Sequence, residues 1–364
     1  MNRLLLHLPL LAILPTGLYF YFFFKRICQT WVEPTLPIKI ILSILTICFV
    51  MPLTYIWGVW TVIVYYLLAF CLLTDLIVWL VKKSQNYHTR LMKIYHLGII
   101  PILCLMLTLG YGYYHMKDIH VQQYSIYTQK QISQNYRVVL MTDLHFGNTM
   151  NKDELKTYCQ QISLQKPDLV LLGGDIVDER STHQQMLDAF EVLGDIKSQY
   201  GIYYVYGNHD EARYARTPHF SMIELAQTIE ENDIHILSDQ VVNIHGGMIL
   251  AGRNDRSYGQ RETSQDLLKK SEDDRFILML DHQPVDLKTN DELGVDLQLS
   301  GHTHGGQMFP VGVISNILGF GEMNYGYRQM SHMQVIVSSG IAGWGYPLRT
   351  GSQSEYVIVD ILKQ

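Results

Sequence analysis

Five apolar runs in this chain lead directly into polar side chains. The runs are 136–141, 169–172, 202–206, 276–280 and 295–299, and the polar residues after them are Asp143, His145, Asp175, Asn208, His209, His282, His302 and His304. Short apolar runs bounded by Gly, Pro and Asp are typical of buried strands. Because α/β sheets bind ligands at the carboxyl ends of their strands, this pattern predicts an α/β domain with a polar site at one edge.

The segments between these runs favour the same fold class. Amphipathic helices are expected over 152–165, 184–197 and 222–232, and an edge strand over 121–127. Further strands are expected at 335–337 and 356–361. The alternation of strands and helices is the pattern of an α/β fold.

The first third of the chain has a different composition. Of the 28 Lys and Arg and the 34 Asp and Glu, only eight and two lie within the first 116 residues, which therefore carry a net charge of +6 against −12 for the remainder. Four apolar runs, at about 4–24, 38–56, 58–81 and 94–114, approach the roughly 20 residues that cross a bilayer. We therefore expect a helical membrane anchor at 1–116 and a separate domain at 117–364.

The basic residues of the anchor predict its orientation. Apart from Arg3, they fall in the first and third loops, at Lys25, Arg26, Lys39, Lys82, Lys83, Arg90 and Lys93. Loops rich in Lys and Arg stay in the cytoplasm. With four spans, the chain would be a multi-pass protein of the cell membrane, with the domain after Tyr114 outside the cytoplasm. Asp75, the only carboxylate within a span, is either functional or, as we favour, a helix-packing or interfacial residue.

The eight polar residues at the strand ends offer oxygen and nitrogen donors and no thiolate. Such a set favours ions of the Mn, Fe or Zn class. Seven or eight ligands exceed what one tetrahedral ion accepts and fit two divalent ions that share a bridging carboxylate. Two such ions, about 3.5–4 Å apart, hold a hydroxide at neutral pH for in-line attack on a phosphoryl group. The alternative is a histidine-rich surface without metal.

The same residues resemble the calcineurin-like metallophosphoesterases. The blocks are Asp143-Leu144-His145, Gly174-Asp175, Gly207-Asn208-His209-Asp210, His282 and Gly301-His302-Thr303-His304, and the later run Gly343 to Arg349 resembles the membrane-tethered bacterial subgroup. The resemblance covers about residue 136 onwards and implies a β-sandwich flanked by helices, with the metal site at the strand ends. It also implies roles. Asp143, His145 and His304 would hold one metal, Asn208, His282 and His302 the other, and Asp175 would bridge. His209 would be the catalytic acid or the positive partner of the phosphoryl oxygens, and not a ligand.

Several residues near these blocks leave alternatives open. Asp210 could orient His209 or cap the following helix. Arg253, Arg256, Arg328 and Arg349 are candidates to grip phosphate, because Arg pairs bidentately with it. The segment 308–328 is either an apolar wall for a lipid tail or, as we favour, a hairpin that packs a small core of its own.

The leading function hypothesis is a membrane-anchored, metal-dependent hydrolase of phosphate esters or pyrophosphates, with lipid-linked substrates among the candidates. The alternatives are a metal-dependent module that binds or senses phospholipid without turnover, and a nuclease of the same fold. No nucleic-acid partner is expected, because the domain is acidic and phosphate contacts need Lys and Arg. The oligomeric state does not follow from the sequence.

Overall fold

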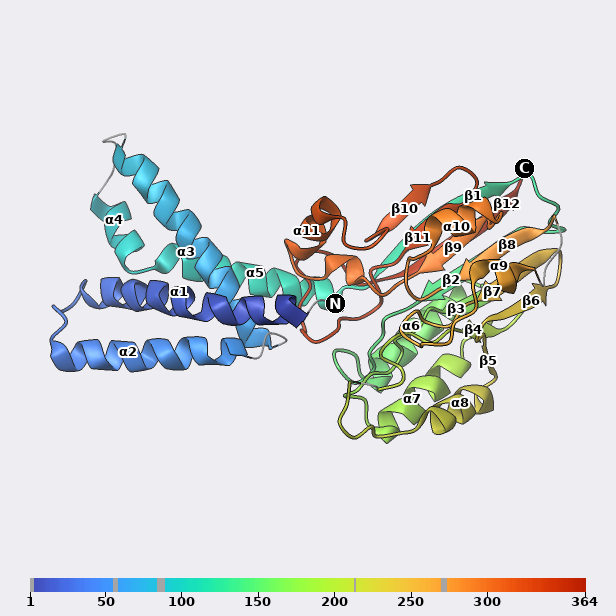
Figure 1. Cartoon of the computed structure of the whole chain (residues 1–364), viewed down its shortest axis with the longest axis horizontal. Coiled ribbons are helices and arrows are strands. Elements are labelled where there is room, and N and C mark those ends of the chain that lie inside the picture. The colour runs from blue at the N-terminus through green and yellow to red at the C-terminus, as the bar shows by residue number, and fades with distance from the viewer. Residues whose placement is uncertain (1–2, 55–57, 84–88, 213, 270–273) are drawn as a thin grey trace. The chain divides into compact units, whose positions relative to one another are not determined.

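A computed structural model describes the chain except for residues 1–2, 55–57, 84–88, 213 and 270–273, and except for the side chains of residues 3–11 and 89. The chain divides into two compact units, Met1–Tyr111 and Gly112–Gln364 (Figure 1). The division lies in the last turns of α5, slightly before the boundary that we proposed at 116/117.

All described secondary-structure elements of the first unit are helices. Its elements are α1 (Arg3–Cys28), α2 (Leu36–Val50), η1 (Met51–Thr54), α3 (Val59–Lys83), α4 (Thr89–His96) and most of α5 (Ile99–Lys117). Three described segments, Leu36–Thr54, Val59–Lys83 and Ile99–Lys117, are long and apolar enough to cross a membrane. The first predicted span falls within α1, part of which lies outside the described side chains, so the expected number of four stays approximate.

Asp75 links three of these helices. Its carboxylate accepts hydrogen bonds from Tyr19 of α1 at 2.6 Å, Arg26 of α1 at 2.8 Å and Tyr95 of α4 at 2.9 Å. A carboxylate with an ion-pair partner and two phenol donors has its charge well compensated. These contacts favour the packing role for Asp75.

The second unit is built on two six-stranded sheets. The first has the order β1 (His120–Thr128), β12 (Glu355–Lys363), β2 (Tyr136–Met141), β3 (Leu169–Leu172), β4 (Ile202–Tyr204) and β5 (Ile234–Ile236). The second has the order β10 (Gly326–Gln329), β11 (Gln334–Val337), β9 (Leu297–Ser300), β8 (Phe276–Leu280), β7 (Met248–Gly252) and β6 (Gln240–Ile244). Within each sheet the central strands β2, β3, β4 and β7, β8, β9 run parallel.

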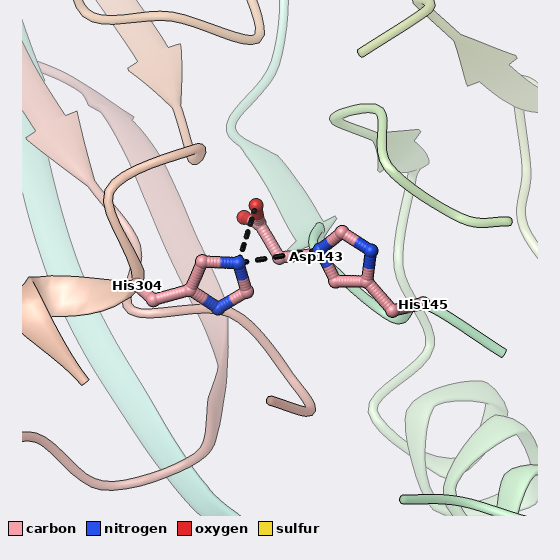
Figure 2. Close-up of side chains that lie close together, drawn as sticks. All are labelled: Asp143, His145 and His304. Carbon is pink, nitrogen blue, oxygen red and sulfur yellow. Dashed lines mark hydrogen bonds and ion pairs between the residues drawn. The ribbon is translucent and has the colours of Figure 1, made fainter. Parts of the chain in front are cut away.

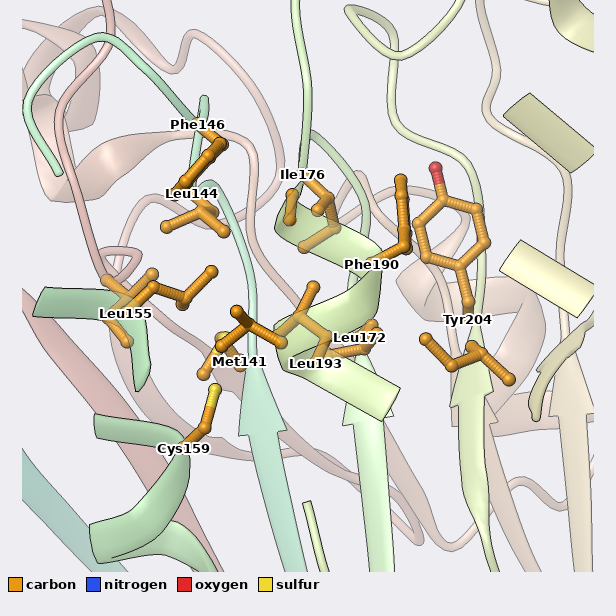
Figure 3. Packing of buried hydrophobic residues seen from close by; sticks show 14 of the residues in the cluster. Met141, Leu144, Phe146, Leu155, Cys159, Leu172, Ile176, Phe190, Leu193 and Tyr204 are labelled. Carbon is orange, nitrogen blue, oxygen red and sulfur yellow. The ribbon is translucent and has the colours of Figure 1, made fainter. Parts of the chain in front are cut away.

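The sheets pack face to face, and helices cover their outer faces. Along β2, Val138 and Leu140 join the core between the sheets, whereas Val139 and Met141 join the core under the helices (Figure 3). A strand buried on both faces reads as a continuous apolar run, because successive side chains point to opposite faces. The predicted α/β sandwich flanked by helices is therefore confirmed.

The helices over the first sheet are α6 (Lys152–Leu164), α7 (His183–Gly194) and α8 (Met222–Glu231). Each begins with a capping box, in which the side chain of Asn151, Thr182 or Ser221 accepts the backbone N–H three residues later. These reciprocal bonds satisfy amide groups that a helix start leaves open. Two short helices, α9 (Ser264–Leu268) and α10 (Leu287–Glu292), pack on the second sheet through Leu267, Leu268 and Leu287.

The segment 308–328 differs from the structure that we favoured for it. It contains the helix α11 (Val311–Leu318), which buries no residue, and then β10. A hairpin that packs its own small core is therefore wrong. Only the flanking Met308 and Met323 are buried, while the apolar residues between them remain exposed.

Candidate metal centre

The polar strand ends meet at one edge of the sandwich. Residues after β2, β3 and β4 come from one sheet, and residues after β8 and β9 come from the other. Parallel strands deliver their carboxyl ends to the same edge, so residues far apart in sequence converge. The structure brings together seven predicted ligands in this way: Asp143, His145, Asp175, Asn208, His282, His302 and His304.

The first group is Asp143, His145 and His304 (Figure 2). The Nε2 atoms of His145 and His304 are 3.2 Å apart, and Nε2 of His304 is 3.5 Å from Oδ1 of Asp143. All three residues are buried. Three potential ligand atoms thus point at one spot, although β2 and β9 lie in different sheets.

The second group is Asp175, His282 and His302. Nε2 of His282 lies 3.1 Å from Oδ2 of Asp175 and 3.3 Å from Nδ1 of His302. The amide oxygen of Asn208 is 3.2 Å from the same Nε2. Two of these neighbours carry oxygen lone pairs and the third is an imidazole nitrogen.

The hydrogen bonds of His282 test whether this group fits a metal. Its Nδ1 is 2.8 Å from the carbonyl oxygen of Gly173, and because a carbonyl only accepts, Nδ1 carries a proton. In the neutral ring Nε2 then presents a lone pair to the oxygens around it. A histidine whose other nitrogen binds a backbone carbonyl is the usual arrangement for a metal ligand.

The charges around His282 point the same way. Burial alone would lower the pKa of His282, but the carboxylates of Asp175 and Asp143 raise it well above its ordinary value. The surroundings therefore stabilise positive charge at this position. A divalent cation supplies that charge and accepts the converging lone pairs, so the residues present fit a metal ion.

Asp175 lies between the two groups. Its Oδ2 is 3.1 Å from Nε2 of His282 and 3.8 Å from Nε2 of His145. Burial would raise the pKa of Asp175, but the imidazole of His282 outweighs it and the pKa falls well below its usual range. One ionised carboxylate thus faces histidines of both groups, as a bridging ligand must.

The backbone at the strand ends is held in an unusual conformation. Five of the seven residues have positive φ: Asp143 (57°), His145 (42°), Asp175 (53°), His302 (71°) and His304 (51°). Residues other than Gly rarely adopt this region, and such strain gathers at functional sites. Gly301 permits the close approach, because a Cβ at this position would overlap the carboxylate of Asp143.

His209 belongs to neither group but lies beside the first. Its ring centroid is 5.3 Å from that of His145, and its backbone N–H donates to Oδ1 of Asp175 at 2.8 Å. The rings of Tyr214 and Trp344 flank it at 5.0 and 5.1 Å. These contacts fix the imidazole at the margin of the cluster, with 12% of its side chain exposed.

Glu179 holds Nδ1 of His209 through its Oε2 at 2.8 Å. Sequence reasoning missed this contact, although Glu179 stands only four residues after Asp175. It also missed Asp178, whose Oδ2 is 3.4 Å from Nδ1 of His145. A run of acidic residues directly after a strand-end Asp was the available signal for both.

Asp210 has neither of the two roles that we considered. Its carboxylate accepts backbone N–H groups of Asp175, Ile176, Val177 and Gly207, at 2.7 to 3.1 Å. Both oxygens are therefore occupied away from His209, and the following helix is capped by Ser221. Burial, with Asp175 nearby, raises the pKa of Asp210 to about 6. Asp210 instead ties together the loops after β3 and β4.

Of the arginine candidates, Arg349 borders the cluster, because its Nη2 lies 3.4 Å from Nδ1 of His304. Arg349 is fully buried, and its guanidinium donates to the backbone carbonyls of His304, Ser339 and Ala342. Arg253 is 2% exposed and pairs with Asp286 at 2.9 Å. Arg328 is exposed on β10 and donates to the carbonyl of Glu322. These contacts are with protein groups, and a phosphate-binding role for the arginines stays a prediction.

Comparison with known proteins agrees with this geometry. A family model described as calcineurin-like phosphoesterase matches residues 136–306. An uncharacterized metallophosphoesterase of Helicobacter pylori strain J99 is 31% identical over 263 residues, which are 70% of this chain and 68% of that protein. One from Campylobacter jejuni is 27% identical and covers 77% of this chain and 73% of its own length.

Some relatives are named as transmembrane proteins. A transmembrane protein with metallophosphoesterase domain from Danio rerio is 29% identical over 63% of this chain and 53% of its own length. Among solved structures, a dimetal phosphatase from Danio rerio is 14% identical over 56% of this chain and 87% of that one, with a TM-score of 0.37, which is too low to add to the assignment. The chain belongs to the calcineurin-like phosphoesterase family and is a membrane-associated, metal-dependent phosphoesterase.

Proposed function

We propose that this chain uses two divalent metal ions to hydrolyse phosphate esters or pyrophosphates, with lipid-linked substrates as the preferred class. The observation that carries the proposal is the carboxylate of Asp175, which faces one histidine of each ligand group. Asp143, His145 and His304 would hold one ion, and Asn208, His282 and His302 would hold the other. The donor set suits ions of the Mn, Fe or Zn class.

Bound ions of this class lower the pKa of water and neutralise charge on a phosphoryl group. Among the protein side chains, His209 would act as the proton donor. Glu179 fixes Nδ1 of the ring, which leaves Nε2 to give a proton to the departing oxygen of the substrate. A positioned acid of this kind contributes about 10²–10⁴-fold to a rate. Burial of the cluster keeps bulk water away and strengthens each of these interactions.

The membrane anchor motivates the choice of substrate and compartment. Lys and Arg gather in the first and third loops of the anchor, which would place these loops in the cytoplasm. A multi-pass anchor with four spans would then carry the domain outside the cytoplasm. A phosphoesterase tethered to a membrane meets phosphate groups at the membrane surface in preference to those in bulk solution.

Phosphate release by the full chain reconstituted with Mn²⁺ tests the activity. The substrates are a soluble phosphomonoester, a phosphodiester and a lipid pyrophosphate. We expect turnover that Asp175→Ala and His209→Ala abolish, whereas His183→Ala, which changes a half-exposed histidine on α7, retains it. Full activity in the first two variants would contradict the proposal. Tight lipid binding without turnover would favour the module that binds or senses phospholipid.

Labelling from each side of the membrane tests the compartment. Leu164 is 78% exposed at the end of α6, so Leu164→Cys offers an accessible thiol in the domain. We expect an impermeant maleimide to label this thiol from outside intact cells. Labelling only from the cytoplasmic side would reverse the proposed orientation.

A further inference from the structure

The helix α11 exposes nearly all of its apolar side chains. Val313, Ile314, Ile317 and Leu318 are 46 to 77% exposed, and no residue of the helix is buried. Between Gly305 and Gly321 the chain has no charged residue. Figure 1 shows that α11 projects beyond the sheets and does not lie on either of their faces. The domain has three well-formed hydrophobic clusters, and none of its described residues covers this apolar helix.

The helix is joined tightly to the metal-ligand loop. Gly312 of α11 approaches the backbone of Gly306 so closely that a Cβ at Gly306 would overlap it. Gly306 lies two residues after His304. The inner side of α11 is therefore fixed to the loop that carries His302 and His304, and its remaining surface faces outward.

The segment around Arg349, which is bonded to the residue after Gly306, meets the last turns of α5, in the third candidate membrane span. The carbonyl of Gly112 accepts the backbone N–H of Arg349 at 2.8 Å. The next residue, Thr350, donates its N–H to Gln307 at 2.9 Å and accepts from the N–H of Phe309 at 3.0 Å. Two hydrogen-bonded contacts thus connect Gly112, near the end of α5, with the residues just before α11.

Aromatic residues mark the level of the membrane surface on α5. Tyr113 and Tyr114 are 57 and 62% exposed at the end of the candidate span. Tyrosines at the ends of spans sit at the boundary between headgroups and acyl chains. Gly112 is adjacent to these tyrosines and accepts the N–H of Arg349, so hydrogen bonds connect this end of α5 to the chain just before α11.

We propose that α11 is an interfacial helix that inserts its apolar face into the lipid bilayer. A helix with a wide apolar face and no charge among its exposed residues gains by burying that face about 5–10 Å into the boundary of headgroups and acyl chains. The consequence is that the loop of His302 and His304 sits at the depth of lipid headgroups. The inference depends on membrane association of the chain and not on the proposed hydrolysis.

Depth-dependent quenching tests this inference on the full chain in liposomes. The five native cysteines are replaced, one polarity-sensitive fluorophore is attached at Ile317→Cys, and the reference carries it at Leu164→Cys. The two sites are 77 and 78% exposed, and α6 ends at the sheet edge opposite the metal groups, beside the start of β3. We expect blue-shifted emission at position 317, with stronger quenching by lipids spin-labelled near the headgroup than by lipids labelled deep in the chain.

The reference position should show emission typical of water and no quenching by either lipid. Equal, water-like emission at both positions would overturn the proposal. Blue-shifted emission at 317 without lipid quenching, together with energy transfer between differently labelled copies, would overturn it in favour of a second copy of the chain. A second probe at Val313→Cys, and retention of bound metal by each labelled protein, guard against local misfolding.

Discussion

The chain changes character at Gln307, between the metal-ligand loop and α11. Before it, residues 300–306 are largely buried, and His302 and His304 have positive φ. After it, residues 309–321 are largely exposed and carry no charge. The first stretch places costly polar groups in the interior, and the second places apolar groups at the surface. Polar groups are usually exposed in a folded protein, and apolar groups are usually buried. Both stretches depart from this distribution, and we infer that each binds a ligand, which is a metal ion for the first stretch and lipid for the second.

Substitutions in the two stretches should differ most in their effect on substrate turnover. We expect His304→Ala to lower kcat/KM by at least about 10³-fold, because a metal ion supplies several kcal/mol of transition-state stabilisation. His183→Ala on α7 is the control, since its side chain is half exposed and belongs to neither ligand group. Steady-state kinetics on a soluble ester measure both. A drop of less than tenfold in His304→Ala would contradict the assignment of this loop.

Stability should separate the two stretches in a matched pair of leucines. Leu297 on β9 is fully buried, and Leu318 on α11 is 59% exposed. Leu297→Ala should lower the free energy of unfolding by about 2–5 kcal/mol, because it leaves a cavity between the sheets. Leu318→Ala should change it by less than about 0.5 kcal/mol. Thermal melting in detergent measures the difference, and equal losses would mean that α11 packs a core.

A smaller effect is expected at the margin of the metal-ligand loop. Glu179→Ala should lower kcat by about 10-fold or more, a part of the 10²–10⁴-fold that a positioned acid contributes. Its metal content should stay unchanged, because Glu179 contacts His209 and neither ligand group. Glu191→Ala is the control, since Glu191 pairs with Lys152 at the surface. An unchanged pH–rate profile in Glu179→Ala would show that Glu179 does not position His209.

The smallest effect is expected away from both stretches, at the ion pair of Arg137 and Asp360 across β2 and β12. The hydrogen bond from Arg137 lowers the pKa of Asp360 below its ordinary value. Its contribution to stability is therefore complete above the ordinary pKa of Asp and disappears as the pH falls through the lowered value. Asp360→Asn should cost about 0.2–1 kcal/mol at pH 7. A cost that does not diminish as the pH is lowered below the ordinary Asp pKa of about 3.9 would contradict the ion-pair explanation.

The elements of the fold that could be predicted were those with one clear pattern of apolar residues along the sequence. The strands β2, β3 and β8 have the bounds that we predicted, 136–141, 169–172 and 276–280. They were predictable because a strand that is buried on both faces needs apolar side chains at successive positions. The seven predicted ligands came together because parallel strands share an edge. Their spacing along the chain was enough to group them, although their roles as ligands stay a prediction.

The contacts that could not be predicted depend on tertiary structure. Arg349 looked like a phosphate ligand, since nothing in its neighbours revealed that five backbone carbonyls would surround its guanidinium. Asp210 looked like a partner of His209 because they are adjacent, but the loop directs its carboxylate to the amides after β3. The apolar residues of α11 suggested a core because sequence hydrophobicity does not distinguish burial in protein from burial in lipid.

The content of bound metal tests the central claim most directly. The full chain, purified in detergent without chelator and saturated with Mn²⁺, is measured by elemental mass spectrometry beside His304→Ala and His302→Ala. We predict two ions per chain in the unchanged protein and the loss of one in each variant, because the two histidines belong to different groups. One ion or none in the unchanged protein, or two ions retained in both variants, would contradict the two-group site.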